Sequence, residues 1–263
     1  PMIVFSAIVP HAPFLLPSIG KSATERLSAT KHALEQVEER LLLSKPDTLL
    51  IISPHAPRYP DAWSANMAPQ FSAHMQEFGD HETAVPARVN YLLLDRIHRS
   101  LREAGIAFTL RSSESLDYGF TVPLVTLANH LPNPSLIPLA PNEGTLEAQL
   151  QFGQALYTIL QREDARIAVI ASADLSHHKT TDGAQERTEA ILYDTQVREA
   201  VRQKQASVLL AASQALPADL HPCGERPIGI LLGLLQDLNT TSEELCYEAP
   251  FGVGYLTATF RTA

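Results

Sequence analysis

Residues 3–13 read IVFSAIVPHAP and residues 49–57 read LLIISPHAP. Each segment starts with a run of apolar residues and ends in the tetrapeptide Pro-His-Ala-Pro. Because proline cannot donate to the hydrogen-bond ladder of a sheet, each tetrapeptide is expected to end a strand and to hold its histidine in a defined loop. Carboxyl ends of parallel strands share one edge, so the two segments predict that His11 and His55 converge there.

Further segments of strand length and helix length alternate along the chain. Short apolar runs without polar alternation are typical of strands buried on both faces of a parallel sheet. We therefore predict an α/β fold, a single domain with a largely parallel central sheet flanked by helices. The expected strands are Ile3–Val9, Leu49–Ile52, Ala107–Leu110, Leu136–Leu139, Ile167–Ala171 and Tyr255–Phe260, and the expected helices are Ser22–Leu43, Val89–Ala104, Leu146–Gln161, Gly183–Lys204 and Pro227–Leu238.

The chain shows no composition break that would divide it. No Gly/Ser-rich linker or low-complexity stretch separates its 263 residues, so one domain spanning residues 1–263 is expected. The least regular stretch is Arg58–Arg88. A loop of that length inside a compact domain is usually a lid or a binding loop, so we predict that it covers the site.

Composition excludes several classes of protein. A formal net charge of −9 argues against a nucleic-acid surface, because phosphate binding needs clustered cations. No apolar run approaches the length of about 20 residues that crosses a bilayer, and no basic segment precedes the apolar N-terminal stretch. Two cysteines cannot form a disulfide framework. We expect a soluble, cytoplasmic protein without nucleic-acid or membrane partners.

A third strand end adds further polar groups to the same edge. The run Ile167–Ala171 leads into Ser172-Ala-Asp-Leu-Ser-His-His, which carries Asp174, His177 and His178. Neutral imidazole is a good ligand for iron, zinc, copper or nickel, and it transfers protons near neutral pH. A single histidine in a proline-flanked loop is often only a turn residue. Three histidine-bearing strand ends together favour a metal site.

An Fe(II) site of the two-histidine type needs one carboxylate as well. Glu225 lies just before Pro227, the expected first residue of a helix, and Gly224 would let the backbone approach a site closely. Glu225 could instead cap that helix or pair with Arg226. Asp174 is the rival ligand, although its spacing from His177 also suits a partner that orients a catalytic imidazole.

These motifs, in this order, resemble those of the class III extradiol ring-cleaving dioxygenases. The resemblance is to the LigB-type catalytic subunit superfamily, which also contains the Memo-like proteins, and it extends from about residue 3 to residue 260. Each motif is short, so their order and their placement at strand ends carry the specificity. The matching segments are Pro10-His11-Ala12-Pro13, Ser53-Pro54-His55, Asp117-Tyr118-Gly119 with Pro123-Leu124, Asp174-Leu175-Ser176-His177 and Gly224-Glu225.

The resemblance implies roles for individual residues. His11, His55 and Glu225 look like the ligands of Fe(II), with zinc or manganese as alternatives, and His177 looks like the acid/base. Ring-cleaving members typically have a histidine where this chain has Tyr118, whose ordinary pKa near ~10 makes it a poor base at neutral pH.

The implied activity is ring opening of a catechol- or aminophenol-type aromatic compound by O₂. Tyr118, His178 and Asp174 would contact the substrate. A zinc-dependent hydrolase and a Memo-like metal-binding or interaction protein without turnover are the alternatives. The expected assembly is either a homodimer, the default among soluble oligomers, or a complex with a small partner subunit, as in some relatives.

Overall fold

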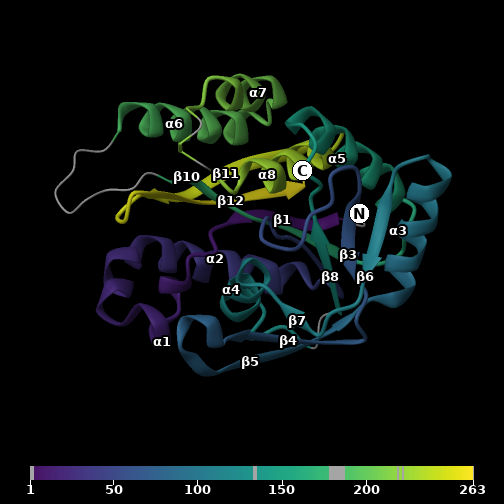
Figure 1. Cartoon of the computed structure of the whole chain (residues 1–263), viewed down its shortest axis with the longest axis horizontal. Coiled ribbons are helices and arrows are strands. Elements are labelled where there is room, and N and C mark those ends of the chain that lie inside the picture. Colours follow the sequence, from purple (N-terminus) through teal and green to yellow (C-terminus); the bar gives the residue numbers. More distant parts are fainter. Residues whose placement is uncertain (1–2, 133–134, 178–186, 218, 221, 263) are drawn as a thin grey trace.

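The computed structural model describes residues 3–132, 135–177, 187–217, 219–220 and 222–262 (Figure 1). Within these ranges the helices are α1 (Pro17–Gly20), α2 (Ser28–Ser44), α3 (Tyr91–Glu103), α4 (Tyr118–Leu127), α5 (Leu146–Leu160), α6 (Thr188–Gln203), α7 (Ala206–Gln214) and α8 (Glu225–Leu235). Three 3-10 helices are η1 (Pro13–Leu15), η2 (Lys21–Leu27) and η3 (Gln76–Phe78). The strands are β1 (Ile3–Val9), β2 (Thr48–Ile52), β3 (Trp63–Asn66), β4 (Gln70–Met75), β5 (Asp80–Val89), β6 (Phe108–Arg111), β7 (Ser115–Leu116), β8 (Ser135–Ala140), β9 (Ile167–Ser172), β10 (Asp174–His177), β11 (Thr240–Glu248) and β12 (Val253–Thr262).

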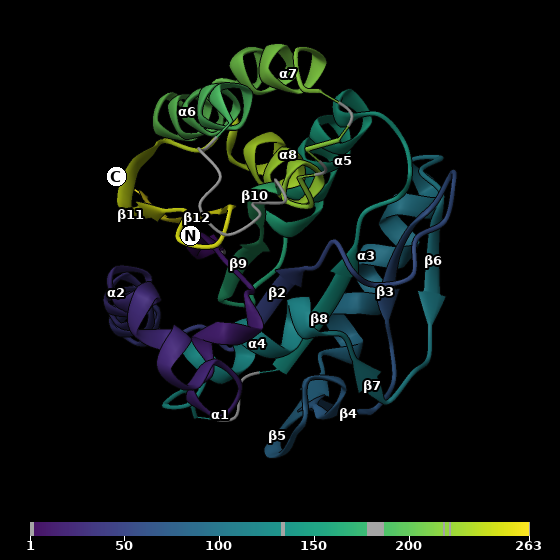
Figure 2. The same cartoon turned by 60° about the vertical axis from the view of Figure 1, so that its left-hand side comes forward.

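Four parallel strands form the centre of the sheet, in the order β1-β9-β2-β8 (Figure 2). Strands β2 and β9 are buried at every residue, which agrees with their uninterrupted apolar sequences. Val9 is in register with Ser172, and Ile52 with Ala171. The carboxyl ends of β1, β2 and β9 therefore lie side by side, as the sequence predicted.

The sheet as a whole is mixed, which corrects the prediction of a largely parallel sheet. Strand β12 runs antiparallel to β1, β10 and β11, and β3 runs antiparallel to β8. The apolar run Tyr255–Phe260 was predicted to be a strand, and the structure confirms this. A strand that is buried on both faces has the same apolar sequence pattern whether it runs parallel or antiparallel to its neighbours. The direction of β12 is set by the tight connection from β11, in which Gly252 adopts a φ of +69°.

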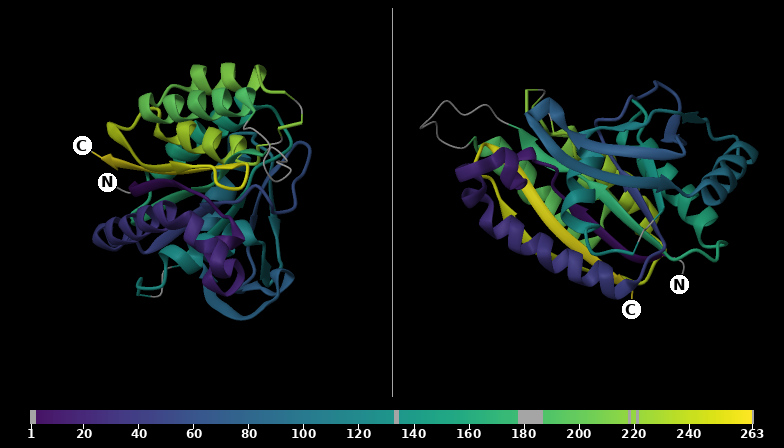
Figure 3. Two further views of the ribbon diagram at one scale, coloured as in Figure 1. Left: turned by 90° about the vertical axis from the view of Figure 1, so that its left-hand side faces the viewer. Right: turned by 90° about the horizontal axis from the view of Figure 1, so that it is seen from below.

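Helices cover both faces of the sheet (Figure 3). Helix α2 packs against β1, β11, β12 and α4 on one face, and α8 packs against β9, α5 and α7 on the other. Helices α5 and α8 approach closely because glycines lie at their contact: a Cβ at Gly233 would lie 2.0 Å from the Leu150 carbonyl oxygen. No helix in the described part of the chain is both long and apolar enough to span a membrane.

The stretch Arg58–Arg88 was predicted to be an irregular loop, and this prediction was wrong. This stretch contains β3 and most of an antiparallel hairpin of β4 and β5, which turns through η3 and Gly79. Strand β4 alternates exposed and buried residues, a pattern with period two that the proline-rich surroundings concealed. One element of the stretch does reach the predicted site, because the Phe78 ring lies edge-on to the Tyr118 ring at 5.3 Å.

Candidate metal centre

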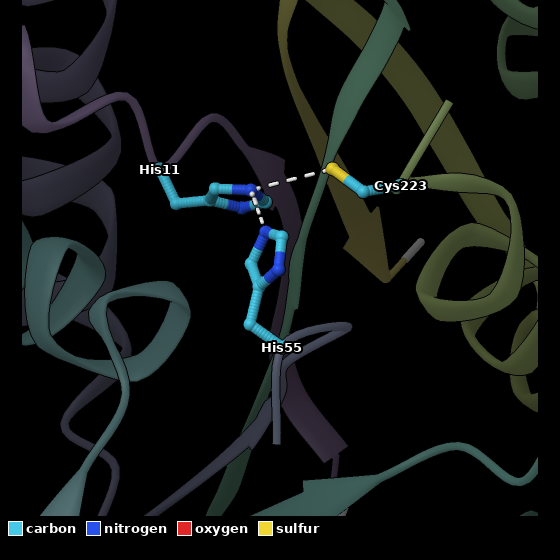
Figure 4. A group of neighbouring side chains, drawn as sticks. All are labelled: His11, His55 and Cys223. Carbon is cyan, nitrogen blue, oxygen red and sulfur yellow. Dashed lines mark hydrogen bonds between the residues drawn. The ribbon is translucent and has the colours of Figure 1, made fainter. Parts of the chain in front are cut away.

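Two imidazoles meet at the carboxyl edge of the central strands (Figure 4). His11 follows β1 and His55 follows β2, and their Nε2 atoms lie 3.0 Å apart. Two nitrogens bound at about 2.1 Å to one ion, at angles between roughly 90° and 109°, would be about 3.0–3.4 Å apart. The separation therefore suits two ligands of a single metal ion.

Hydrogen bonds fix the tautomer of His11. The Ser172 hydroxyl donates to the Gly119 carbonyl at 2.6 Å, so its oxygen is free to accept from His11 Nδ1 at 2.9 Å. With its proton on Nδ1, the ring presents the Nε2 lone pair to His55 and to the space beside it. Burial, together with the charge of His177, lowers the pKa of His11 to about 3. The ring is therefore neutral and ready to act as a ligand.

His55 is held beside Tyr118. The Tyr118 hydroxyl lies 2.9 Å from His55 Nε2, and the two rings stack with centroids 4.4 Å apart. Burial, and then the charges of His11, His177 and Arg58, lower the pKa of His55 to about 3. Burial also raises the pKa of Tyr118, so its hydroxyl keeps its proton and acts as a hydrogen-bond donor. Tyr118 begins α4, and Asp117 caps that helix by accepting from the Gly119 amide.

The described residue that completes a group of three candidate ligands with these imidazoles is Cys223. Its Sγ lies 3.4 Å from His11 Nε2, and the candidate ligand atoms of His11, His55 and Cys223 all lie within 4.8 Å of one another. A sulfur at about 2.3 Å and a nitrogen at about 2.1 Å from one ion would be about 3.1–3.6 Å apart. Burial raises the pKa of the Cys223 thiol, so metal binding would have to displace its proton. Sequence reasoning passed over this cysteine, although it stands two residues before Glu225.

Glu225 was the predicted third ligand, and the structure does not place it in that group. Its Oε1 accepts a hydrogen bond from the Tyr193 hydroxyl at 3.2 Å, in the first turn of α8. The helix begins at Glu225, two residues earlier than expected, so Pro227 occupies its third position. The role of Glu225 as a metal ligand stays a prediction.

Asp174 approaches the imidazole pair more closely than sequence spacing suggested. Its Oδ1 accepts from the His11 backbone amide at 3.1 Å, and its Oδ2 lies 3.5 Å from His11 Nε2. Burial raises the pKa of this carboxyl to about 6, and its interactions with His11 and His177 act in the opposite direction. Asp174 can therefore position the His11 loop, and its second oxygen faces the same space as the imidazole lone pair.

His177 forms a second group with Asp174 and Cys223, whose candidate ligand atoms also lie within 4.8 Å of one another. Its Nδ1 donates to the Leu175 carbonyl at 2.9 Å, which leaves the lone pair on Nε2. That arrangement suits a proton acceptor. His178, predicted to line the substrate pocket, lies outside the described residues.

Two glycines allow the loops to approach this closely. A Cβ at Gly224 would lie 2.6 Å from the Asp174 carbonyl oxygen, to which the Gly224 amide donates at 2.8 Å. A Cβ at Gly119 would lie 2.3 Å from the Ser53 hydroxyl. Gly224 therefore allows the close backbone approach that the sequence predicted, and its hydrogen bond to Asp174 holds the Cys223 loop against β10. Neutral imidazoles, a thiol and a carboxylate form a donor set that fits a divalent transition metal.

Comparisons with known proteins agree with this architecture. A family model described as the catalytic LigB subunit of aromatic ring-opening dioxygenase matches residues 6–258. Protein CA_C1420 of Clostridium acetobutylicum is 21% identical over 258 residues, which cover 94% of this chain and 55% of that protein. The chain therefore spans about half the length of that curated relative.

A solved structure shares the fold. The crystal structure of uncharacterized protein JW3007 from Escherichia coli K12 matches with a TM-score of 0.70 and 13% identity, covering 98% of this chain and 99% of that one. At this identity the likeness concerns the fold alone.

Proposed function

The chain belongs to the LigB family of catalytic subunits of aromatic ring-opening dioxygenases, and from this premise we propose that it is a non-haem Fe(II)-dependent extradiol dioxygenase. The proposed substrate is a catechol- or aminophenol-type aromatic compound, with O₂ as co-substrate. The observation that carries the proposal is the pair of neutral imidazoles whose Nε2 atoms lie 3.0 Å apart at the strand edge. That pair is the constant part of the two-histidine, one-carboxylate iron site.

His11 and His55 would hold the metal, with a third ligand from Asp174, Cys223 or Glu225. A bound Fe(II) would supply binding positions for adjacent ring heteroatoms and for O₂, and would lower the pKa of a coordinated hydroxyl. Asp174 is favoured as the carboxylate because its Oδ2 lies 3.5 Å from His11 Nε2. Glu225, the ligand that the family resemblance implies, would have to leave its contact with Tyr193.

The protein's own groups would handle the protons. His177 Nε2 carries a lone pair and would accept the second ring-hydroxyl proton, then return it to the opening ring. General acid–base help of this kind typically contributes ~10²–10⁴-fold. Tyr118, protonated and adjacent to His55, would donate a hydrogen bond to an oxygen of the substrate.

One observation favours a second candidate function. Cys223 Sγ lies 3.4 Å from His11 Nε2, and thiolate together with imidazole suits zinc or another soft metal better than an oxygen-activating iron site. A zinc-dependent hydrolase, or a metal-binding protein without turnover, would use His11, His55 and Cys223 as its ligands.

Reconstitution separates these candidates. Anaerobic loading with Fe(II), Zn(II) or Mn(II) in turn, followed by oxygen-electrode assays with catechol and 2-aminophenol, tests ring opening directly. We expect oxygen uptake with Fe(II) alone, lost in His55→Ala and lost without loss of iron in His177→Gln. Tight stoichiometric zinc binding that Cys223→Ser abolishes, with no oxygen uptake under any loading, would replace the dioxygenase by the second candidate.

A separate series of variants identifies the third ligand. Metal affinity should fall sharply in Asp174→Asn and change little in Cys223→Ser and Glu225→Gln. A large loss in Glu225→Gln would restore the ligand set implied by the family, and would mean that α8 turns this carboxylate toward the metal on binding.

A further inference from the structure

The carboxylate of Asp117 lies between the end of β2 and the start of α4. Its Oδ1 accepts from the Ser53 hydroxyl at 2.6 Å and from the Gly119 amide at 2.9 Å. Ser53 directly follows β2, and Gly119 belongs to the first turn of α4. One carboxylate oxygen therefore joins the end of a central strand to the beginning of a helix.

This carboxylate acts on the backbone of His55 through Ser53. The His55 amide donates to the Ser53 hydroxyl oxygen at 3.2 Å, and the same hydroxyl donates its proton to Asp117. The Ser53 side chain is fully buried, and the Ser53 amide donates to the Leu139 carbonyl of β8 at 3.0 Å. Asp117 thus fixes the orientation of a hydroxyl that ties the His55 loop to the sheet.

Asp117 also acts on the ring of His55, through the residue that follows it. Tyr118 is the first residue of α4, and its ring stacks on the His55 ring with centroids 4.4 Å apart. The Asp117 side chain caps this helix, and a cap holds the first turn in place because it accepts from an amide that has no partner inside the helix. Loss of the cap would therefore loosen the Tyr118 ring against His55.

The same turn of α4 extends to His11. The Gly119 carbonyl accepts from the Ser172 hydroxyl at 2.6 Å, and the Ser172 oxygen accepts from His11 Nδ1 at 2.9 Å. A Cβ at Gly119 would lie 2.3 Å from the Ser53 hydroxyl and 3.0 Å from Asp117 Oδ1, so this turn is closely packed against both side chains. His11 and His55 are therefore both linked to one carboxylate.

The negative charge of Asp117 strengthens these bonds. Burial raises the pKa of its carboxyl, whereas the hydrogen bonds from Ser53 and Gly119 and the positive charge of Arg111 act in the opposite direction. Hydrogen bonds accepted by an ionised group are roughly twice as strong as bonds between neutral groups. In its ionised form Asp117 therefore holds both donors more firmly than a neutral cap would.

We propose that Asp117 is a positioning residue of the metal centre, which holds the His55 loop and the first turn of α4 so that the two imidazoles can share one ion. A partner that orients metal ligands typically contributes about 10–100-fold to metal affinity. A helix cap without this role would contribute to stability alone. The role at the metal rests on the proposed function, whereas the hold on the two segments can be measured in the metal-free protein.

Zn(II) affinity, measured by competition with a chromophoric chelator, tests the role at the metal. Asp117→Ala should weaken binding by about 10–100-fold. Asp117→Asn keeps an oxygen that can accept both bonds, so its affinity should stay within about threefold of wild type. Ser53→Ala removes only the bond on the His55 side and should weaken binding by about threefold to tenfold, which keeps the test valid if Asp117→Ala does not fold.

Asn90→Ala is the matched control. Asn90 caps α3 by accepting from the Leu93 amide at 3.1 Å, and it donates to the Thr48 hydroxyl at 2.8 Å. Thr48 is the first residue of β2, so Asn90 joins a helix start to the opposite end of the strand that Asp117 holds. This variant should lower the free energy of unfolding in urea, as Asp117→Ala does, and leave Zn(II) affinity unchanged.

Hydrogen exchange of the metal-free protein, followed by mass spectrometry, tests the hold on the two segments. Asp117→Ala should speed exchange by about tenfold in peptides that cover residues 53–57 and 118–122, because the His55 and Gly119 amides lose their fixed acceptors. Asn90→Ala should leave both peptides at the wild-type rate.

The outcomes separate this role from the proposed function. Wild-type affinity and wild-type exchange in a folded Asp117→Ala would overturn the proposal, and so would a loss of affinity in Asn90→Ala as large as that in Asp117→Ala. Faster exchange in Asp117→Ala, together with no Zn(II) binding by the wild type, would refute the metal centre and leave the hold of Asp117 on the two segments established.

Discussion

Ser172→Ala tests the link between the central strands and the metal ligands. The Ser172 hydroxyl is buried at the end of β9, where it accepts from His11 Nδ1 and donates to the Gly119 carbonyl. Alanine keeps the backbone and the small volume but removes both bonds. Two buried polar groups, the His11 imidazole after β1 and the Gly119 carbonyl in α4, then lose their hydrogen bonds to Ser172.

The magnitude follows from those two groups. Each unsatisfied buried donor or acceptor costs about 1–3 kcal/mol, so the free energy of unfolding of the metal-free protein should fall by roughly 2–6 kcal/mol. His11 would also lose the acceptor that keeps its proton on Nδ1. Losing such an orienting partner typically weakens metal binding by about 10–100-fold.

Urea denaturation and metal titration measure the two effects separately. Ser64→Ala is the matched control, because Ser64 is fully buried in β3 and its hydroxyl has no hydrogen-bond partner in the described part of the chain. It should change the unfolding free energy by less than about 1 kcal/mol and leave metal affinity unaltered. If Ser172→Ala behaved like Ser64→Ala in both assays, the assigned tautomer of His11 would be wrong.

Three further predictions concern the same site. Gly224→Ala should destabilise the protein by about 1–3 kcal/mol in urea denaturation, because its Cβ would lie 2.6 Å from the Asp174 carbonyl; an unchanged midpoint would contradict the close approach. Tyr118→His should raise kcat/KM for catechol by about tenfold or more in the oxygen-electrode assay, since it supplies a second base; a lower value would show that the tyrosine hydroxyl is itself required. His11 and His55 have pKa values of about 3 in the folded protein, below the ordinary 6.5. They therefore favour the folded state above pH 6.5, and this contribution is lost as the pH falls. The pKa of Asp174 is raised to about 6, so this carboxyl has the opposite effect. Between pH 4 and 6 the unfolding free energy of metal-free His55→Gln should therefore rise less steeply with pH than that of wild type. The two slopes should differ by about 1.4 kcal/mol per pH unit. Equal slopes would contradict the buried neutral ring of His55.

The positions of His11 and His55 could be predicted because they follow from local chemistry. A proline on each side limits the backbone of the loop, and an uninterrupted apolar run identifies the strand that precedes it. Parallel strands then bring their carboxyl ends together whatever the rest of the fold does. The same reasoning placed Asp174 and His177 after β9.

Which of Cys223 and Glu225 lies nearer the imidazoles could not be predicted in this way. Cys223 and Glu225 stand two residues apart, and which one faces the imidazoles depends on where α8 begins and how it is rotated. The helix begins at Glu225, so this carboxylate faces Tyr193 while the thiol faces His11. That rotation is set by tertiary packing against α5 and β9, which no local pattern in the Cys-Gly-Glu segment reports.

The direction of β12 and the presence of strands β4 and β5 could not be predicted from the sequence either. The apolar run in β12 gives burial but no direction. Strands β4 and β5 are rich in polar residues and lie toward the edge of the sheet, and β5 contains a proline.

The most direct measurement of the central claim is metal stoichiometry. Wild-type protein and His55→Ala are loaded anaerobically with Fe(II), freed of excess metal, and analysed by inductively coupled plasma mass spectrometry. With the two Nε2 atoms sharing one ion, wild type should retain one iron per chain and the folded variant almost none. Equal retention by both proteins would contradict the centre at His11 and His55.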